Sequence, residues 1–169
     1  QSGRALRTVQ CGERERFAGA HDKCTHPVRI PLRRVKLEQD SDRVRAFVVG
    51  AGEPLTFTAL HRAECTSALR LKVFRGEATE AEVSSALRDI DEDAASGVLC
   101  ATDLDWAASW WRCVGLTDSH AATTGCRTRD TLHVACAAAL GARVMVTADP
   151  RQARLARKAG LKTVNPLAA

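Results

Sequence analysis

The chain has 169 residues, of which 45% are hydrophobic, 27% charged and 4% aromatic, and its formal net charge is +5. This length and composition fit one domain with a buried core. No apolar run approaches the roughly 18 residues of a membrane span, so we expect a soluble protein with no membrane partner. Because aromatic residues are scarce and Tyr is absent, we do not expect base stacking to dominate any binding of nucleic acid.

The basic excess lies entirely near the N-terminus. Residues 1–45 hold 11 Lys and Arg against 6 Asp and Glu, whereas residues 46–169 hold 14 of each. An Arg-rich arm of this kind suits a polyanion such as RNA, but a solvated and partly disordered tail would have the same composition. Both interpretations of this segment stay open.

Cysteine usage and the first residues indicate a cytoplasmic protein. The seven Cys residues include no Cys-x-x-Cys pair, and an odd, scattered set fits a reducing compartment better than a disulfide framework. The Arg-rich start has no apolar stretch behind it, such as a secretory signal would have. We therefore expect cytoplasmic localisation, with most Cys side chains serving as small core residues.

Residues 1–40 form an atypical basic segment with little regular pattern. Pro27 and Pro31 interrupt every helical period, and we expect one short strand here, at 28–30 or 34–37. A zinc site is the other chemistry to consider, but the spacing of the nearby ligands matches no standard finger. Those ligands are His21, Cys24 and His26.

From Ser41 the pattern becomes regular, and residues 41–166 are expected to form one domain. Ser41 is typical of a helix N-cap, and Gly50 begins a turn into a short strand at 55–58. A helix follows at 59–75. Thr79 and Glu82 form a capping box that opens the next helix, which ends at Gly97 before a strand at 98–101.

The second half of the sequence repeats this alternation. We expect Asp103 and Asp105 to cap a helix that carries Trp106 and Trp110, which are typical of a core or a subunit interface. A short helix at 117–124 and a helix from 128 to Gly141 follow, then a strand at 143–147, a helix around 153–156 and a strand at 162–165. Short strands that alternate with helices predict an α/β fold with a largely parallel sheet.

Two carboxylates converge on one edge of that expected sheet. Asp130 lies at the start of an apolar helix, and Asp149 follows the buried strand at 143–147. The carboxyl ends of parallel strands are where open α/β sheets bind ligands. Each Asp has a second interpretation, because Asp before Pro150 is an ordinary N-cap and Asp is common in any first helical turn.

Glu64 is the third informative carboxylate. It falls within the apolar stripe of the helix at 59–75, on the face expected to meet the core. A buried carboxylate needs an Arg or Lys partner, a metal ion or a proton. A structural ion pair and a ligand role are both open, and the small residues around Glu64 leave space for a ligand.

Three acids in these positions suit a hard divalent cation. Mg²⁺ and Mn²⁺ prefer oxygen ligands, and carboxylate-held metals commonly serve phosphodiester hydrolysis. No Walker loop, Gly-x-Ser-x-Gly elbow or Rossmann fingerprint occurs in the sequence, so nucleotide cradling and acyl transfer lack support.

Four stretches together resemble the PIN-domain family, specifically the VapC-like ribonuclease toxins. Residues 119–125, the Asp-x-Leu-His-x-Ala pattern that begins at Asp130, the Thr-x-Asp pair of Thr147 and Asp149, and residues 155–161 resemble its C-terminal half. The run from Leu60 to Glu64 is similar to the family's Glu-bearing helix. The likeness covers about residues 41–166.

The resemblance implies a three-layer α/β/α sandwich around a mainly parallel sheet. It also implies a Mg²⁺- or Mn²⁺-dependent endoribonuclease that hydrolyses RNA, a homodimer, and a small cognate antitoxin. Glu64, Asp130 and Asp149 fall on the family's second, third and fourth acidic positions, and Thr147 matches the hydroxyl residue lining the site. The candidate RNA contacts beside these acids are Arg127, Arg129 and Arg151.

The N-terminus departs from the family's pattern. The family begins with a strand that ends in Asp followed by Thr or Ser, and this Asp is expected between Pro27 and Pro31, where none occurs. Asp22 is the nearest candidate for the missing metal ligand. The competing hypothesis is a catalytically impaired PIN-like protein that binds RNA or a partner.

Overall fold

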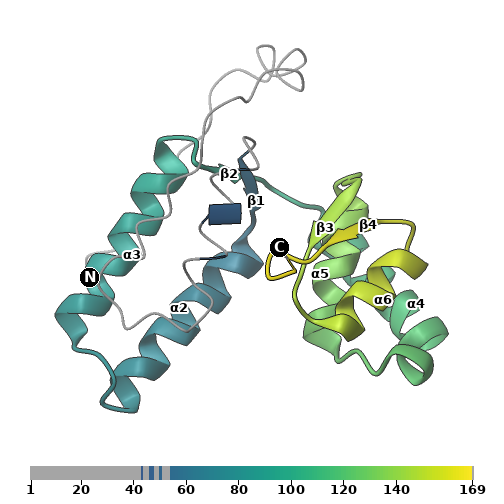
Figure 1. The fold of residues 1–169 in the computed structure, drawn as a ribbon, viewed down its shortest axis with the longest axis horizontal. Helices are drawn as coiled ribbons and strands as arrows, with labels where there is room; N and C mark the ends of the chain where they lie inside the picture. Colours follow the sequence, from purple (N-terminus) through teal and green to yellow (C-terminus); the bar gives the residue numbers. More distant parts are fainter. Residues whose placement is uncertain (1–42, 44–45, 48–49, 51–53, 169) are drawn as a thin grey trace, which may run out of the picture.

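The computed structural model describes residues 43, 46–47, 50 and 54–168. Positions 43 and 46–47 are helical, as the pattern from Ser41 predicts, but Gly50, which was expected to begin a turn, is helical as well. The expectations for residues 1–40, including the short strand, the rejected zinc ligands and Asp22, lie outside the described residues. The elements that follow are β1 (Leu55–Phe57), α2 (Ala59–Phe74), α3 (Glu80–Ala95), β2 (Leu99–Ala101), α4 (Trp106–Thr124), α5 (Thr128–Ala139), β3 (Val144–Val146), α6 (Pro150–Lys158) and β4 (Lys162–Val164) (Figure 1).

The expected three-layer α/β/α sandwich around one central sheet is wrong. In the described residues, β1 pairs in parallel only with β2, and β3 pairs in parallel only with β4, so two separate two-stranded sheets form (Figure 1). Each strand has three residues, so it offers a short ladder, and most of the described chain is helical. The alternation of helix and strand was predicted correctly, but the joining of the strands into one sheet was not.

Two groups of elements result. α2 and α3 lie with β1 and β2, while α4, α5 and α6 lie with β3 and β4 (Figure 1). An ion pair of 2.7 Å between Arg62 of α2 and Asp91 of α3 joins the two helices of the first group. Leu60 of α2 packs against the cluster around Leu132 of α5, so the start of α2 joins the two groups.

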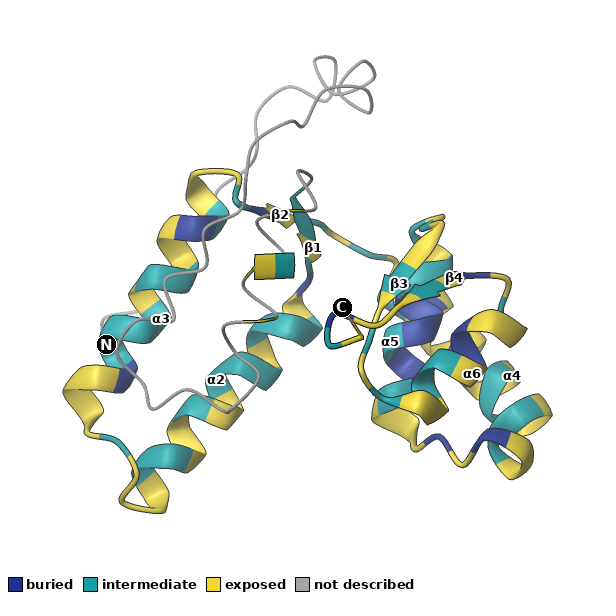
Figure 2. Ribbon diagram, viewed as in Figure 1, coloured by how far each residue is buried: buried dark blue, intermediate teal, exposed yellow. Residues whose placement is uncertain are grey.

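The best-buried core lies in the second group. Figure 2 shows buried positions concentrated along α5, whereas α2 contains no buried residue. One cluster surrounds Leu132 and Cys136, and a second joins Val134 of α5 to Leu155 and Ala156 of α6. These contacts hold α5 against α6, and each of these helices carries a candidate acid at its start.

The local capping signals are largely confirmed. The capping box of Thr79 and Glu82 opens α3, and the Asp105 side chain accepts a hydrogen bond from Ala108 N at the start of α4. Gly125 ends α4 with a φ of 69°, a left-handed conformation that suits glycine. The expected separate helix at 117–124 is wrong, because α4 continues through Gly115, which lowers helix stability without breaking the backbone hydrogen bonds.

One buried acid in α3 gives a pH-dependent prediction. Asp93 is only 7% exposed, and its Oδ2 atom has no hydrogen-bond partner in the part of the chain that the structure describes. Burial, together with the negative charges of Asp89 and Glu92, raises the pKa of Asp93 from 3.8 to about 6. The folded chain therefore binds this proton more tightly than the unfolded chain does, so the fold loses stability as pH rises from about 4 to 6.

Asp93→Asn is accordingly expected to stabilise the protein above pH 6. The gain should be about 1–2 kcal/mol near pH 7.5 and should nearly vanish at about pH 3, where Asp93 is mostly protonated in both states. Urea unfolding at the two pH values measures it, with Asp118→Asn, which replaces an exposed acid of α4, as the control. A gain that is equal at both pH values would contradict the assignment of the effect to ionisation.

Candidate functional site

Asp130 lies in the first turn of α5, as predicted. Arg127 occupies the N-cap, and buried side chains from Thr131 to Cys136 hold the helix against its neighbours. The Asp130 side chain is 22% exposed, and its Oδ1 atom lies 4.0 Å from the Arg129 Nε atom. This carboxylate is thus partly sheltered but open to a ligand from solvent.

Asp149 follows β3 and forms the N-cap of α6. Its Oδ1 atom accepts hydrogen bonds from the backbone N–H groups of Arg151, at 2.7 Å, and Gln152, at 3.4 Å. The Arg151 Nε atom lies 3.7 Å from the same oxygen. The backbone N–H of Arg151 is the main cause that holds the pKa of Asp149 below its ordinary value, so the carboxylate is ionised at neutral pH. The capping interpretation is therefore correct. All these contacts are made by the Oδ1 atom, so the Oδ2 atom takes no part in the cap and a ligand role for it stays open.

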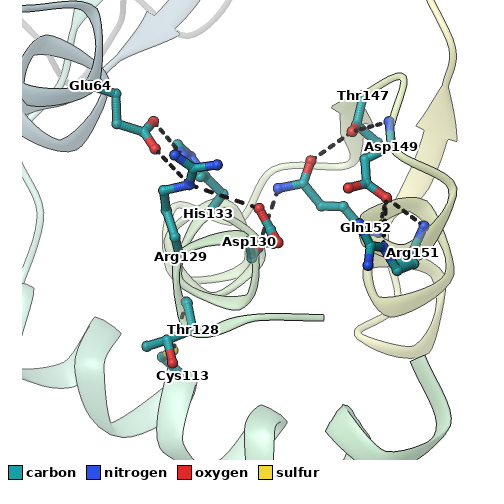
Figure 3. A network of polar contacts seen from close by, with 10 residues as sticks. All are labelled: Glu64, Cys113, Thr128, Arg129, Asp130, His133, Thr147, Asp149, Arg151 and Gln152. Carbon is teal, nitrogen blue, oxygen red and sulfur yellow. Dashed lines mark hydrogen bonds and ion pairs between the residues drawn. The ribbon is translucent and has the colours of Figure 1, made fainter. Parts of the chain in front are cut away.

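Gln152 connects the two acids, although the sequence did not lead us to predict it as a site residue. Its Nε2 atom donates to the Asp130 carbonyl at 3.3 Å, while its Oε1 atom accepts from the Thr147 hydroxyl at 2.6 Å. The Thr147 hydroxyl in turn accepts from the Asp149 backbone N–H at 3.1 Å. Figure 3 shows Gln152 between Asp130 and Asp149. A signal was present, since a Gln three residues after an Asp N-cap is typical of a capping box.

Glu64 lies on the other side of Asp130 and is bound by basic side chains (Figure 3). The His133 Nε2 atom donates to Glu64 Oε2 at 2.6 Å, and the Arg129 Nε atom lies 3.4 Å from Oε1. The Glu64 side chain is 30% exposed, so it is partly buried, and it has the basic partners that a carboxylate on this face was expected to need. In the described residues Glu64 makes an ion pair between α2 and α5, which was the structural interpretation of this acid.

Two histidines extend this contact. The His61 and His133 rings lie 5.0 Å apart, and the His61 Nδ1 atom accepts from the Thr58 backbone N–H at 3.2 Å. Burial lowers the pKa of His61, the nearby His133 lowers it further, and Glu64 opposes both. An acceptor Nδ1 and a lowered pKa both indicate a neutral His61 with its proton on Nε2.

The three arginines that we predicted to contact RNA are accessible. Arg127 is exposed at the start of α5. The Arg129 and Arg151 side chains are 73% and 52% exposed, and each lies beside one of the two acids. These guanidinium groups can therefore meet a phosphate that approaches Asp130 or Asp149 from solvent.

The donor chemistry fits Mg²⁺ or Mn²⁺ through two acids. Among the described residues, no group of three His, Cys, Asp or Glu side chains is arranged to hold a metal ion. Mg²⁺ is often bound through only one or two carboxylates, with water and substrate phosphates completing its shell. Asp130 and Asp149 are carboxylates of this kind, whereas Glu64 pairs with Arg129 and His133 on the other side of Asp130.

Comparison with protein-family models gives no match, and a search of curated proteins gives none either. The resemblance to the PIN family therefore rests on the sequence motifs alone and stays a prediction. Within residues 54–168 and the few positions described before them, no helix combines the length and hydropathy that a membrane crossing needs.

Proposed function

We propose that the chain is a metal-dependent endoribonuclease of the PIN type, similar to VapC toxins. The observation that carries the proposal is the placement of Asp130 and Asp149 on the two sides of Gln152, at adjoining starts of α5 and α6. Arg129 and Arg151 flank these acids. Carboxylates beside accessible guanidinium groups suit a cation and a phosphodiester at the same place.

In this proposal Asp130 and Asp149 hold the cation. When bound, Mg²⁺ or Mn²⁺ supplies Lewis acidity to a phosphoryl oxygen and lowers the pKa of attacking water. Arg129 and Arg151 neutralise the backbone charge, and Gln152 keeps the Thr147 hydroxyl beside Asp149. Hydrolysis adds water across one P–O ester bond, which leaves a phosphate on one RNA fragment and a hydroxyl on the other.

Incubation of the purified protein with a panel of single-stranded and structured RNAs tests the proposal. We expect cleavage with Mn²⁺ or Mg²⁺ and none with EDTA, and loss of cleavage in Asp130→Asn. Cleavage that survives EDTA or Asp130→Asn would contradict the assignment of the site. RNA binding without cleavage would favour the alternative, a catalytically impaired protein that binds RNA. The pairing of Glu64 with Arg129 and His133 favours this alternative, because it occupies the third acid.

Gln152→Ala is expected to lower cleavage about tenfold to a hundredfold, the range seen when groups that orient metal ligands are removed. The variant loses the contacts that join Asp130, Thr147 and the start of α6. Gln152→Glu is the matched variant, because it can still accept from Thr147 but cannot donate to the Asp130 carbonyl. Initial rates at saturating Mn²⁺ measure the effect, and an unchanged Gln152→Ala rate would show that Gln152 does not organise the acids.

We also propose that the protein forms a homodimer through α4. Trp106 packs against the core, but Trp110, Trp111 and Val114 are 48%, 75% and 53% exposed. Covering such a patch favours association with a second copy. Light scattering at micromolar concentration should report a dimer that Trp111→Glu dissociates, and a monomeric parent protein would remove the proposal. A cognate antitoxin that blocks the acids is the further partner proposed from the family resemblance.

A further inference from the structure

A cavity opens beside Asp149, away from Glu64. It has a volume of about 640 Å³, which is within the range of small-ligand sites. Residues after β3, along α6 and at the end of β4 line it. The members that carry hydrogen-bonding side chains are Thr147, Asp149, Arg154, Arg157, Thr163 and Asn165.

Two arginines give this cavity its charge. Arg154 and Arg157 are three residues apart on α6, so their side chains share one face of the helix. Each makes one hydrogen bond to a neutral oxygen: Arg154 donates to the Thr124 carbonyl at 3.4 Å, and Arg157 donates to the Thr163 hydroxyl at 2.9 Å. In the described part of the chain, no carboxylate lies within ion-pair distance of either guanidinium. Most of their donors are therefore available to an anion.

The remaining wall distinguishes between possible anions. Two hydroxyls, one amide and the Asp149 carboxylate line the cavity alongside the arginines. Asp149 repels a peptide carboxylate and a phosphate alike, so its charge does not distinguish between them, but its oxygens can accept a hydrogen bond from a neutral hydroxyl. An RNA chain brings a 2′-hydroxyl with each phosphate, so its phosphate can meet the arginines while its hydroxyl donates to an oxygen on the wall.

We propose that the cavity between α6 and β4 binds a backbone phosphate of single-stranded RNA through Arg154 and Arg157. This site deepens the proposed function and rests on it, because Asp149 belongs both to the cavity wall and to the acidic pair. RNA held here runs past Asp149 toward Asp130. Arg154 and Arg157 thereby set which segment of the RNA reaches the acids, without themselves contacting the reacting bond.

The first test places a charge in the cavity without removing an arginine. Ala153 lines the cavity on α6, so Ala153→Glu introduces a carboxylate and Ala153→Gln introduces the same bulk without charge. The full chain is titrated in EDTA against a fluorescein-labelled single-stranded RNA of about 12 nucleotides, a length within the site sizes of such binders. Anisotropy should show at least about tenfold weaker binding for Ala153→Glu than for Ala153→Gln. Equal affinities would overturn the proposal.

The second test counts phosphate contacts. The double variant Arg154→Ala/Arg157→Ala should reduce the salt dependence of binding by about 0.7 per arginine in a plot of log affinity against log salt. Arg143→Ala is the matched control, because it removes the same charge at the other end of β3. If Arg143→Ala lowers the salt dependence as much as each cavity arginine does, the effect comes from the overall charge of the protein. That result would overturn the assignment of the phosphate to the cavity. Thermal unfolding confirms that each variant is folded.

The binding experiments in EDTA and the cleavage experiments test this proposal and the nuclease proposal separately. Binding in EDTA requires no cleavage, so RNA that binds through the cavity but is never cut supports the site and removes the nuclease. Cleavage that is insensitive to all cavity variants supports the nuclease and removes the site. Polyglutamate is the competitor that tests for an acidic-peptide site. If it displaces the labelled RNA as effectively as unlabelled RNA of equal charge does, the cavity binds acidic peptides and the RNA proposal is overturned.

Discussion

Asp149→Asn is expected to lower RNA cleavage by about a hundredfold or more while leaving the stability of the protein nearly unchanged. Asn caps helices about as well as Asp does, so the substitution keeps the hydrogen bonds from the N–H groups of Arg151 and Gln152. It removes only the negative charge, which the capping role does not need. Cleavage rates with Mn²⁺ and a urea unfolding curve, measured on the same preparation, separate the two roles of Asp149.

Two further variants complete this comparison. Asp118→Asn, at an exposed position of α4, controls for loss of one negative charge and should cut RNA normally. Glu64→Gln should reduce cleavage less than Asp149→Asn does, because Arg129 and His133 already hold the Glu64 carboxylate. If Glu64→Gln is the more damaging variant, Glu64 rather than Asp149 belongs to the reacting centre. If Asp149→Asn cuts RNA at the normal rate, Asp149 is only a cap.

The positions of the two Asp residues could be predicted because their signals are local. Asp149 precedes Pro150 directly after an apolar strand, and Asp130 opens a regular apolar helix, so neither placement depends on distant contacts. Capping at Thr79 and Gly125 is equally local. A few neighbouring residues determine backbone conformation at these points, and the sequence therefore predicts them well.

The failures in the sheet and at Glu64 involve contacts between distant residues. Whether β1 and β2 share a sheet with β3 and β4 depends on long-range pairing, which three-residue strands specify weakly. Glu64 meets His133 across 69 positions of sequence, and no periodic pattern in α2 identifies that partner. The apolar stripe of α2 indicated burial, but the described residues leave this helix partly exposed. A periodic pattern identifies the apolar face of a helix, but it does not say how completely other elements cover that face.

Leu155→Ala is expected to destabilise the protein by about 2–5 kcal/mol, the range for a buried leucine whose cavity cannot collapse. Leu155 is 1% exposed and packs with Val134 and Ala156 in the cluster that joins α6 to α5. It is the principal apolar anchor of the helix that carries Gln152 and the two cavity arginines. Loss of this anchor should therefore weaken RNA binding as well as the fold.

Urea unfolding measures the stability change, and Val144→Ala, at a position of β3 that is 46% exposed, is the control with an expected loss below about 1 kcal/mol. RNA anisotropy in EDTA, at a temperature where Leu155→Ala remains folded, measures the effect on α6. Full stability loss with unchanged RNA affinity would show that α6 keeps its position without Leu155. Equal stability losses in the two variants would contradict the assignment of the core to the contact between α5 and α6. The exposed Val144 of β3 would then contribute as much to stability as the buried Leu155 of α6.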